Sequence, residues 1–265
     1  MSATVSEDVV LQETRGPVKW IFINRIERRN ALNEQVANGI IAAIDTAEAD
    51  QTCRAIVLTG AGDKAFCAGG DLAPSASGAP FTVNPADPRN FVVRMLKRMA
   101  VCTLPIIARV NGPALAGGLG LMCACDMAVA ASTAKFGTPE SGIGLFPAMI
   151  MPTLQRVLPL RKLFELCITG ELFTADEALA MDLVNYVVPP EELDAKVEWL
   201  LARVVNKSPT AIRLGKIGFQ AVRDMNINQA YEFGQLMLPI MAMTEDCKEG
   251  FAAFQGKRKP SFPGK

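Results

Sequence analysis

The 265-residue sequence contains no histidine. Mechanisms in which a histidine activates a serine or a cysteine are therefore excluded. Zinc binding is disfavoured as well, because Cys123 and Cys125 supply too few ligands by themselves. The seven cysteines are an odd number without the spacing of a disulfide framework, so we expect reduced thiols that are mostly buried. No metal site is predicted.

Long hydrophobic runs are missing too. No apolar run approaches the roughly 18 residues that a membrane-spanning helix needs, and the first ten residues are polar and lack a signal-peptide core. We therefore expect a cytoplasmic protein that makes no use of a membrane. Charge is balanced at 27 basic and 27 acidic residues. Only residues 256–260 are locally basic, so nucleic acid is not an expected partner, whereas a phosphate-bearing small molecule suits this tail.

Strand and helix signals alternate along the first two thirds of the chain. Half of the residues are hydrophobic, which fits one domain of good size or a domain with an appendage. Short apolar runs predict strands, and amphipathic segments between them predict helices, one of which places Val36, Ile40 and Ile44 on one face. The alternation favours an α/β core of parallel strands covered by helices. Strands are predicted at residues 17–24, 55–59, 105–110, 127–131 and 185–188.

Strand signals nearly stop after residue 145. A helix is predicted to end at Gly170, and Thr174 with Glu177 predicts a capping box that begins the next helix. Amphipathic helices dominate from residue 195 onward. The methionine and aromatic residues of these helices suit packing within the chain or against another subunit.

These signals divide the chain into two regions. Residues 1–194 are predicted to form the core, and residues 195–265 a C-terminal helical region. Residues 75–88 are rich in serine, proline and alanine, which favours a linker over a mobile loop beside a site.

One glycine-rich segment imitates a dinucleotide-binding fingerprint. Residues 59–65, TGAGDKA, follow a predicted strand with the required glycine spacing. The segment FCAGGDL comes next instead of an amphipathic helix, so no helix N-terminus would face a pyrophosphate. We therefore interpret residues 59–65 as a tight turn.

Two further glycine segments offer backbone hydrogen-bond donors. In FCAGGDL, Gly69 and Gly70 leave backbone N–H groups unshielded by side chains. In NGPALAGGLG, Gly117 and Gly118 begin a predicted helix, whose N-terminus carries unpaired N–H groups and the positive end of the dipole. Either segment alone is also typical of a turn or of close packing. One donor from each segment would form an oxyanion hole.

The order and spacing of six motifs resemble the crotonase superfamily of enoyl-CoA hydratases and isomerases over nearly the whole chain. The resemblance implies an α/β fold, a crotonase-like spiral of ββα units with a C-terminal helical region that builds homotrimers, often paired into homohexamers. The motifs are RRNALN at residues 28–33, FCAGGDL at 66–72, NGPALAGGLGLMCACD at 111–126, FGTPESGIGLFP at 136–147, residues 168–188, and EGFAAFQGKRKP at 249–260.

The resemblance also implies a site. The N–H groups of Gly70 and Gly117 would bind the thioester oxygen of an acyl-CoA substrate and stabilise an enolate, and loss of one such donor typically costs about 2.7–4 kcal/mol. Coenzyme A is part of the substrate, so no separate cofactor is expected. Residues implied to bind it are Arg29, Ala31, Leu32, Ala68, Asp71, Leu72, Gly118, Pro139 and, near the phosphates, Lys257.

Simpler roles remain open for three of these residues. Arg29 and Lys257 also suit solvated surface charges. Asp71, like Asp126, suits capping or the fixing of a turn better than proton transfer.

This sequence departs from the family at one catalytic position. The hydratases use two glutamates, because one water must be deprotonated and held while a proton is delivered to the neighbouring carbon. The position of the first is Gly120, and only the second, Glu140, is present. Ala148 occupies the position of the aspartate that the family's dienoyl-CoA isomerases use. A single carboxylate suffices for a 1,3-proton shift, so double-bond isomerisation with Glu140 as the only acid/base is favoured.

The surroundings of Glu140 support a role as base. Apolar residues follow it at Ile143, Leu145 and Phe146, and such neighbours are predicted to raise the pKa of its carboxyl. The alternative is stabilisation of a helix start after Pro139. Residues 146–157 replace a glycine-rich run of the family and predict a bulky, apolar pocket floor. Two other functions stay open, which are hydration with one glutamate and non-catalytic binding of acyl-CoA.

Overall fold

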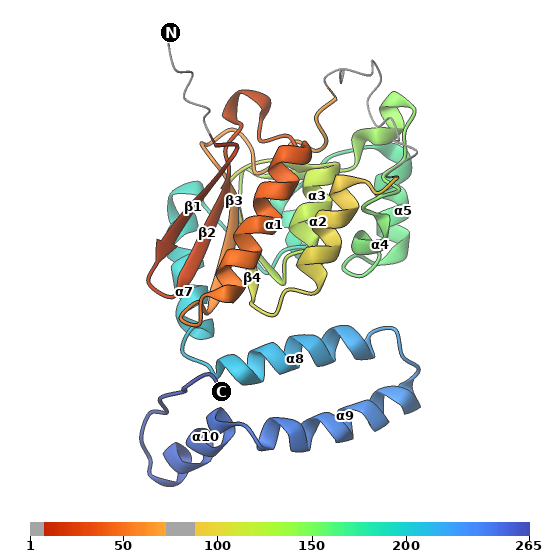
Figure 1. Ribbon diagram of the computed structural model, residues 1–265. Coiled ribbons are helices and arrows are strands. Elements are labelled where there is room, and N and C mark those ends of the chain that lie inside the picture. Colours follow the sequence, from red (N-terminus) through yellow and green to blue (C-terminus); the bar gives the residue numbers. More distant parts are fainter. Residues whose placement is uncertain (1–7, 73–87) are drawn as a thin grey trace.

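A six-stranded sheet forms the centre of the structure (Figure 1). The computed structural model describes residues 8–72 and 88–265, so the loop predicted at residues 75–88 lies outside the described part apart from its last residue. β1 pairs antiparallel with β2, and the remaining neighbours are parallel. In spatial order the strands are β1 (Val10–Arg15), β2 (Val18–Ile23), β3 (Ala55–Gly60), β4 (Ile106–Val110), β6 (Met127–Ala131) and β9 (Tyr186–Val188).

The five predicted strands are confirmed, and β1 is an additional strand that the sequence did not predict. Five of its six residues are exposed, so the strand lacks the alternation of apolar and polar residues that marks a half-buried strand. β1 pairs only with β2 and lies at the edge of the sheet. Its pairing therefore depends on the backbone of β2 rather than on buried side chains.

Helices cover one face of this sheet. All six residues of β3 are buried, as expected for a central parallel strand with both faces covered. Val36, Ile40 and Ile44 of α1 (Glu34–Ala49) lie in the main core cluster, as predicted from their spacing. Burial of each such side chain contributes about 1.5–3 kcal/mol. Packed beside α1 is α2 (Phe91–Ala100).

The other face of the sheet is covered by α7 (Leu193–Val204). Leu193, Val197 and Leu200 of this helix form a second core cluster with Trp20 and other residues of the sheet. The predicted division at residues 194 and 195 therefore falls inside a helix that packs on the core. In the structure, the separate helical layer begins with α8 (Pro209–Val222).

A second, three-stranded sheet adjoins the core. β5 (Ala114–Leu115) is parallel to β7 (Lys135–Gly137), and β7 is antiparallel to β8 (Phe173–Thr174). These strands are two or three residues long, too short to give a periodic signal. Directly after β5 comes α3 (Gly117–Cys123), and after β7 a 3₁₀ helix, η2 (Pro139–Ile143). The small sheet thus places the glycine segment that begins α3 beside the segment that carries Glu140.

After η2, the predicted end of one helix and the predicted start of the next are confirmed. The segment continues through α4 (Met151–Leu154) into α5 (Leu160–Thr169). Gly170 ends α5 in the left-handed conformation, with a φ of 66°. Thr174 and Glu177 form the predicted capping box of α6 (Ala175–Ala180).

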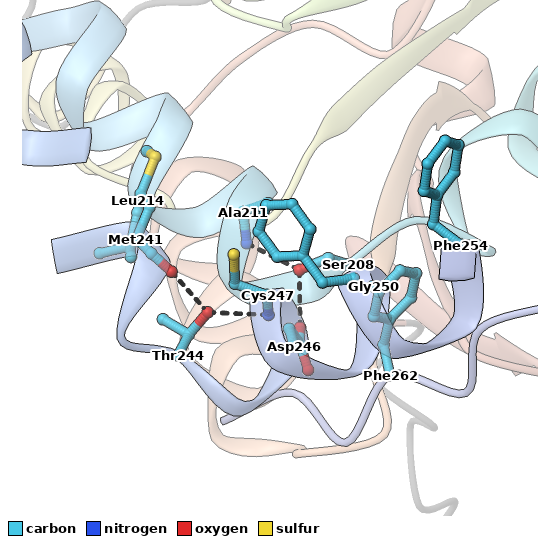
Figure 2. A pocket seen from close by; sticks show the side chains of 11 residues that line it. Ser208, Ala211, Leu214, Met241, Thr244, Asp246, Cys247, Gly250, Phe254 and Phe262 are labelled. Atoms are coloured by element: carbon cyan, nitrogen blue, oxygen red, sulfur yellow. Dashed lines mark hydrogen bonds between the residues drawn. The ribbon is translucent and has the colours of Figure 1, made fainter. Parts of the chain in front are cut away.

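The C-terminal layer consists of α8, α9 (Ile227–Ala242) and α10 (Glu245–Gln255), which lie below the core in Figure 1. Asp246 is 1% exposed and joins the parts of this layer. Its carboxylate accepts hydrogen bonds from the hydroxyls of Ser208 and Thr210 and from the N–H of Gly264. Figure 2 shows Asp246 beside an apolar pocket of about 500 Å³ between α8 and α10. Phe251, Phe254 and Phe262 line this pocket.

Candidate active site

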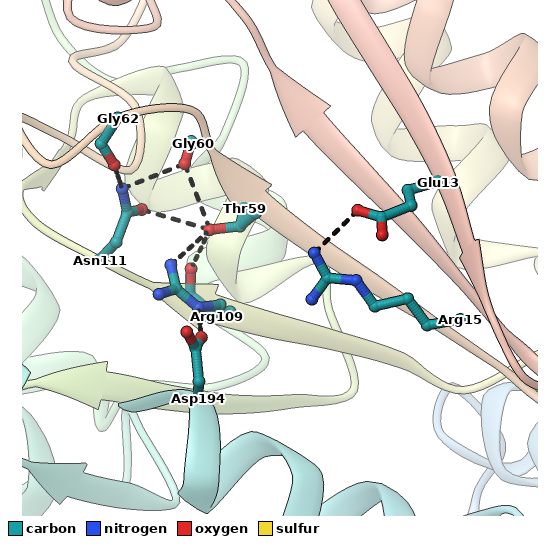
Figure 3. A network of polar contacts seen from close by, with 8 residues as sticks. All are labelled: Glu13, Arg15, Thr59, Gly60, Gly62, Arg109, Asn111 and Asp194. Atoms are coloured by element: carbon teal, nitrogen blue, oxygen red, sulfur yellow. Dashed lines mark hydrogen bonds and ion pairs between the residues drawn. The ribbon is translucent and has the colours of Figure 1, made fainter. Parts of the chain in front are cut away.

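The first glycine segment is a turn that Asn111 holds in place (Figure 3). The amide of Asn111 donates to the carbonyl oxygens of Gly60 and Gly62 at 3.1 and 2.7 Å. Nearby, the hydroxyl of Thr59 donates to the carbonyl oxygen of Arg109 at 2.8 Å. Within residues 8–72, no helix follows this turn. The interpretation of residues 59–65 as a tight turn is confirmed.

The FCAGGDL segment lies against the loop that precedes α1. Leu32 N–H donates to the carbonyl oxygen of Gly69 at 2.7 Å, and Asp71 N–H donates to that of Leu32 at 2.8 Å. A third bond joins Ala68 N–H to the carbonyl oxygen of Arg29 at 3.0 Å. Two segments that the resemblance assigned to coenzyme A binding therefore form one paired ribbon.

Hydrogen bonds from Arg25 and Asn30 hold this ribbon in place. Neither residue was predicted from the sequence as part of the site. Asn30 is 1% exposed, accepts from Arg25 N–H at 3.0 Å and donates to the carbonyl oxygen of Ala65 at 2.8 Å. The Arg25 guanidinium donates to the carbonyl oxygen of Ala31 and to the carboxylate of Asp71, each at 2.7 Å. The Arg25 and Asp71 side chains are only 16% and 18% exposed. The role of Asp71 in this structure is an ion pair between two segments rather than the expected capping or fixing of a turn.

The two remaining glycine segments meet at one point. A Cβ atom on Gly117 would lie 3.5 Å from the backbone nitrogen of Gly70. A Cβ atom on Gly69 would lie 3.3 Å from the nitrogen of Gly117 and 2.7 Å from the Cβ of Ala116. Gly69 has a φ of 100°, which strains any other residue. Within the described part of the chain, neither the Gly70 nor the Gly117 N–H donates a hydrogen bond.

Gly118 allows this approach. A Cβ atom there would lie 2.1 Å from the carbonyl oxygen of Cys67, closer than any two such atoms can pack. Leu115 N–H donates to the same oxygen at 3.0 Å. Gly118 therefore brings the start of α3 against the FCAGGDL segment, a role in backbone packing beside the one that the resemblance implied.

Glu140 lies on the neighbouring segment. The N–H of Ala116 donates to the carbonyl oxygen of Gly137 at 2.8 Å, which ties the residue before Gly117 to the strand that leads into η2. One carboxylate oxygen of Glu140, Oε2, is buried and has no hydrogen-bond partner among the described residues. Burial raises the pKa of Glu140, so the predicted direction is confirmed.

The packing of η2 involves an element distant in the sequence. Ile143, Leu145 and Phe146 are exposed, and their effect on the pKa of Glu140 stays a prediction. The end of α5 packs on η2. There, burial raises the pKa of Cys167, the hydroxyl of Thr138 lowers it, and the nearby charge of Glu140 raises it. Contacts between α5 and η2 could not be derived from the apolar residues that follow Glu140 in sequence.

Residues 13–265 match the family described as enoyl-CoA hydratase/isomerase. The chain belongs to this enzyme family. Crotonyl-CoA hydratase from Syntrophomonas wolfei is 34% identical over 98% of this chain and 99% of its own length. The short-chain-enoyl-CoA hydratase from Clostridium acetobutylicum is 34% identical over 94% of this chain and 95% of its own. A solved enoyl-CoA hydratase from Mycobacterium smegmatis has a TM-score of 0.87, with 32% identity, and the match covers 97% of this chain and 99% of that one.

These matches confirm the crotonase-like fold. The residues implied to bind coenzyme A fall into two groups. One group lies beside the glycine amides on the paired ribbon, on α3 or at the start of η2, and consists of Arg29, Ala31, Leu32, Ala68, Asp71, Leu72, Gly118 and Pro139. Leu32 is fully buried, and its Cδ1 lies 3.4 Å from the Cβ position of Gly117.

Lys257 stands apart from that group. It follows α10, which packs on α8 and α9 in the layer below the core (Figure 1). Within one chain of this family member, the structure does not bring Lys257 to the glycine amides. Its role at the phosphates stays a prediction.

Residues 8–72 and 88–265 contain no helix that is long and apolar enough to cross a membrane. The same residues contain no cluster of three or more cysteine, aspartate or glutamate side chains suited to a metal ion.

Proposed function

We propose that this enzyme moves a double bond in an enoyl-CoA thioester. The N–H groups of Gly70 and Gly117 bind the thioester oxygen, and Glu140 is the acid/base. The observation that carries this proposal is a buried carboxylate oxygen without a partner, on a segment hydrogen-bonded to the residue before Gly117. Position 120, one helical turn after Gly117, carries no side chain.

The proposed reaction conserves atoms and electrons. Glu140 as carboxylate removes a proton from C2 of a 3-enoyl thioester, and the electron pair of the broken C–H bond delocalises through C1 onto the thioester oxygen and through C3 onto C4. Two N–H donors stabilise this developing negative charge, and each is worth about 2.7–4 kcal/mol at comparable sites. Glu140 then returns the proton to C4, so the double bond between C3 and C4 becomes one between C2 and C3. Coenzyme A enters as part of the substrate, and a proton shift draws on no separate cofactor.

A raised pKa suits this cycle. A carboxyl that must both accept and return a proton works best when its pKa lies near the working pH. Burial shifts the pKa of Glu140 in that direction. The burial of one carboxylate oxygen, Oε2, keeps water away from that atom, which favours return of the proton to the substrate.

Hydration is the second candidate. It is favoured by the names of two relatives, a crotonyl-CoA hydratase and a short-chain-enoyl-CoA hydratase. In this reading Glu140 alone deprotonates water, which adds to C3, and a proton reaches C2. The missing second carboxylate predicts a lower rate than that of an enzyme with two.

One assay separates these functions. The purified protein is incubated with crotonyl-CoA and, separately, with 3-hexenoyl-CoA, while the absorbance of the conjugated thioester is followed. Isomerisation increases this absorbance with 3-hexenoyl-CoA, and hydration decreases it with crotonyl-CoA. Glu140→Gln is expected to abolish turnover, with Glu171→Gln as a control at an exposed carboxylate. Tight binding of both thioesters without turnover would instead identify a non-catalytic acyl-CoA-binding protein.

We further propose that the chain assembles into a homotrimer or homohexamer. No residue of α9 is buried within one chain, although the helix carries large apolar side chains that are more than half exposed. An isolated helix layer gains most of its stability from packing of its apolar face. Sedimentation velocity tests this, and a monomer at micromolar concentration would contradict it. The exposed side chains are Ile227, Tyr231, Leu236, Leu238 and Ile240.

A further inference from the structure

Gly120 and Ile150 occupy one another's space. Gly120 lies three residues after Gly117 in α3, so both residues are on the same face of the helix. A Cβ atom on Gly120 would lie 2.3 Å from Cγ2 and 2.5 Å from Cβ of Ile150. Any side chain at position 120 therefore collides with Ile150.

Ile150 has little freedom to move aside. Its side chain is 3% exposed, and its Cβ is fixed by the backbone. Ile150 N–H donates to the carbonyl oxygen of Pro147 at 3.2 Å, and its carbonyl oxygen accepts from Leu154 N–H at 3.0 Å in the first turn of α4. Relief of the collision would require a shift of α4 rather than a change of rotamer.

The location of this pair has a chemical consequence. Position 120 lies one turn along α3 from the Gly117 amide. When that amide binds the thioester oxygen of a substrate, the acyl chain of the substrate comes within reach of this position. A carboxylate in this place would be a second proton-transfer group opposite Glu140. It would also hold a water molecule there. The Ile150 side chain fills the place with hydrocarbon, whereas a bound water needs a cavity with at least about 10–15 Å³ of probe-occupied volume and two to four polar partners.

We propose that Ile150 is a specificity-determining residue, which favours proton return over water addition by filling the volume beside Gly120. This inference rests on the proposed function of the Gly70, Gly117 and Glu140 site. Glu140 and Ile150 belong to one segment, in which Glu140 accepts from Leu145 N–H at 2.9 Å through its main-chain oxygen. The described residues show no hydrogen bond between Glu140 and Ile150, so the two residues can be varied separately.

The packing part of the inference is tested by melting temperatures. Alanine at a helical glycine normally stabilises a helix. Gly120→Ala is nevertheless expected to lower the melting temperature in the wild-type background and to raise it in the Ile150→Gly background, in which the Cβ of residue 150 is also removed. Gly215→Ala, at a helical glycine with open space around its Cβ position, is the matched control and should raise it. An unchanged or raised melting temperature for Gly120→Ala in the wild-type background would overturn the inference.

The chemical part is tested with crotonyl-CoA. The double variant Gly120→Glu with Ile150→Gly is compared with Gly120→Gln with Ile150→Gly, which has the same volume without a carboxylate. We expect the glutamate variant to hydrate crotonyl-CoA at least about tenfold faster, because the second carboxylate activates water. Equal hydration rates in the two variants, both folded by circular dichroism and both binding the thioester, would overturn the inference.

Failure of the proposed function gives a different result. A wild-type protein that is inert towards 3-hexenoyl-CoA, together with hydration gained only in the glutamate double variant, contradicts the isomerisation proposal and supports the role of Ile150. A wild-type protein that hydrates crotonyl-CoA as fast as the glutamate double variant overturns the role of Ile150. Efficient hydration by Gly120→Glu alone, with Ile150 intact, overturns it as well.

Discussion

The backbone nitrogen of Gly70 lies 3.5 Å from the place that a Cβ on Gly117 would occupy. A small ligand atom bound by both amides must use this same space. The absence of side chains at both residues therefore leaves two backbone N–H groups unshielded at neighbouring positions.

Substitution at Gly117 should separate catalysis from folding. In Gly117→Ala the new methyl group fits beside Leu32 Cδ1 at 3.4 Å but covers the Gly70 amide. We expect kcat to fall about 100- to 1,000-fold, as at other sites that lose one oxyanion donor, with a small change in melting temperature. Steady-state kinetics with the best acyl-CoA substrate and a thermal melt measure both effects.

Gly118→Ala provides the contrasting control. Its Cβ would lie 2.1 Å from the Cys67 carbonyl oxygen, so this variant should lose stability rather than activity alone. Wild-type kcat in Gly117→Ala would contradict the placement of the oxyanion hole.

The pH dependence of activity and stability should report on Glu140. Burial raises the pKa of its carboxyl in the folded state, so the folded state holds this proton more tightly than the unfolded state does. The associated stability is present below the unfolded pKa and is lost as pH rises through the raised folded pKa. Turnover should show the opposite trend, because the base must be ionised.

Glu140→Gln isolates this effect. At neutral pH the variant should be more stable than the wild type, because a neutral amide replaces a charged carboxylate in a buried position. Chemical denaturation between pH 4 and pH 8, in steps of about one unit, measures the difference. Identical pH profiles of stability for the two proteins would show that the carboxyl is not buried in solution.

The Arg25–Asp71 pair should stabilise the paired ribbon. Asp71→Asn removes a charged partner at 2.7 Å from a guanidinium that is 16% exposed. We expect a loss of about 1.5–3 kcal/mol in the free energy of unfolding, the range for hydrogen bonds to charged groups. Asp224→Asn is the control, because Asp224 is 70% exposed in its pair with Arg156 and should cost about 0–1 kcal/mol. Equal losses in the two variants would contradict this role.

Asp246 should hold the C-terminal layer together. Burial raises the pKa of Asp246, but hydrogen bonds from Ser208, Thr210 and Gly264 outweigh that effect, and the net pKa is lowered. The stability that this carboxylate supplies is present above its unfolded pKa and is lost as pH falls through the lowered folded pKa. Asp246→Ala removes the acceptor of two hydroxyls and of two N–H groups, those of Thr210 and Gly264.

Limited proteolysis measures the effect on this layer. In Asp246→Ala we expect faster cleavage near α8 and α10 at neutral pH, while the core remains protected. Asp176→Ala, at an exposed residue of α6, is the control. Cleavage at the wild-type rate would show that other contacts hold the layer.

Local patterns in the sequence predicted most of the core. Five strands follow from short apolar runs, and the buried face of α1 follows from the spacing of Val36, Ile40 and Ile44. The caps at Gly170 and Thr174 follow from residue types that such ends require. β1 and the three short strands of the second sheet were missed, since they have no periodic signal and depend on partners distant in the sequence.

The site was predicted unevenly for the same reason. Gly70, Gly117 and Glu140 stand in motifs that resemble a known family, and the structure brings their segments together. Arg25 and Asn30 were missed because their importance comes from contacts with Asp71 and with the turn after β3. The absence of room at Gly120 depends on Ile150, which no local pattern connects to it.

Residue types alone determined that histidine chemistry is excluded, that the core is α/β, and that two glycine segments leave backbone donors unshielded. Only the tertiary structure decided that these glycine segments meet, that α5 packs on the η2 segment of Glu140, that α7 belongs to the core, and that Ile150 fills the space beside Gly120. The physical reason is the range of the interactions. Conformational preferences and helix caps act between neighbours in sequence, whereas close packing and desolvation depend on atoms that folding brings together.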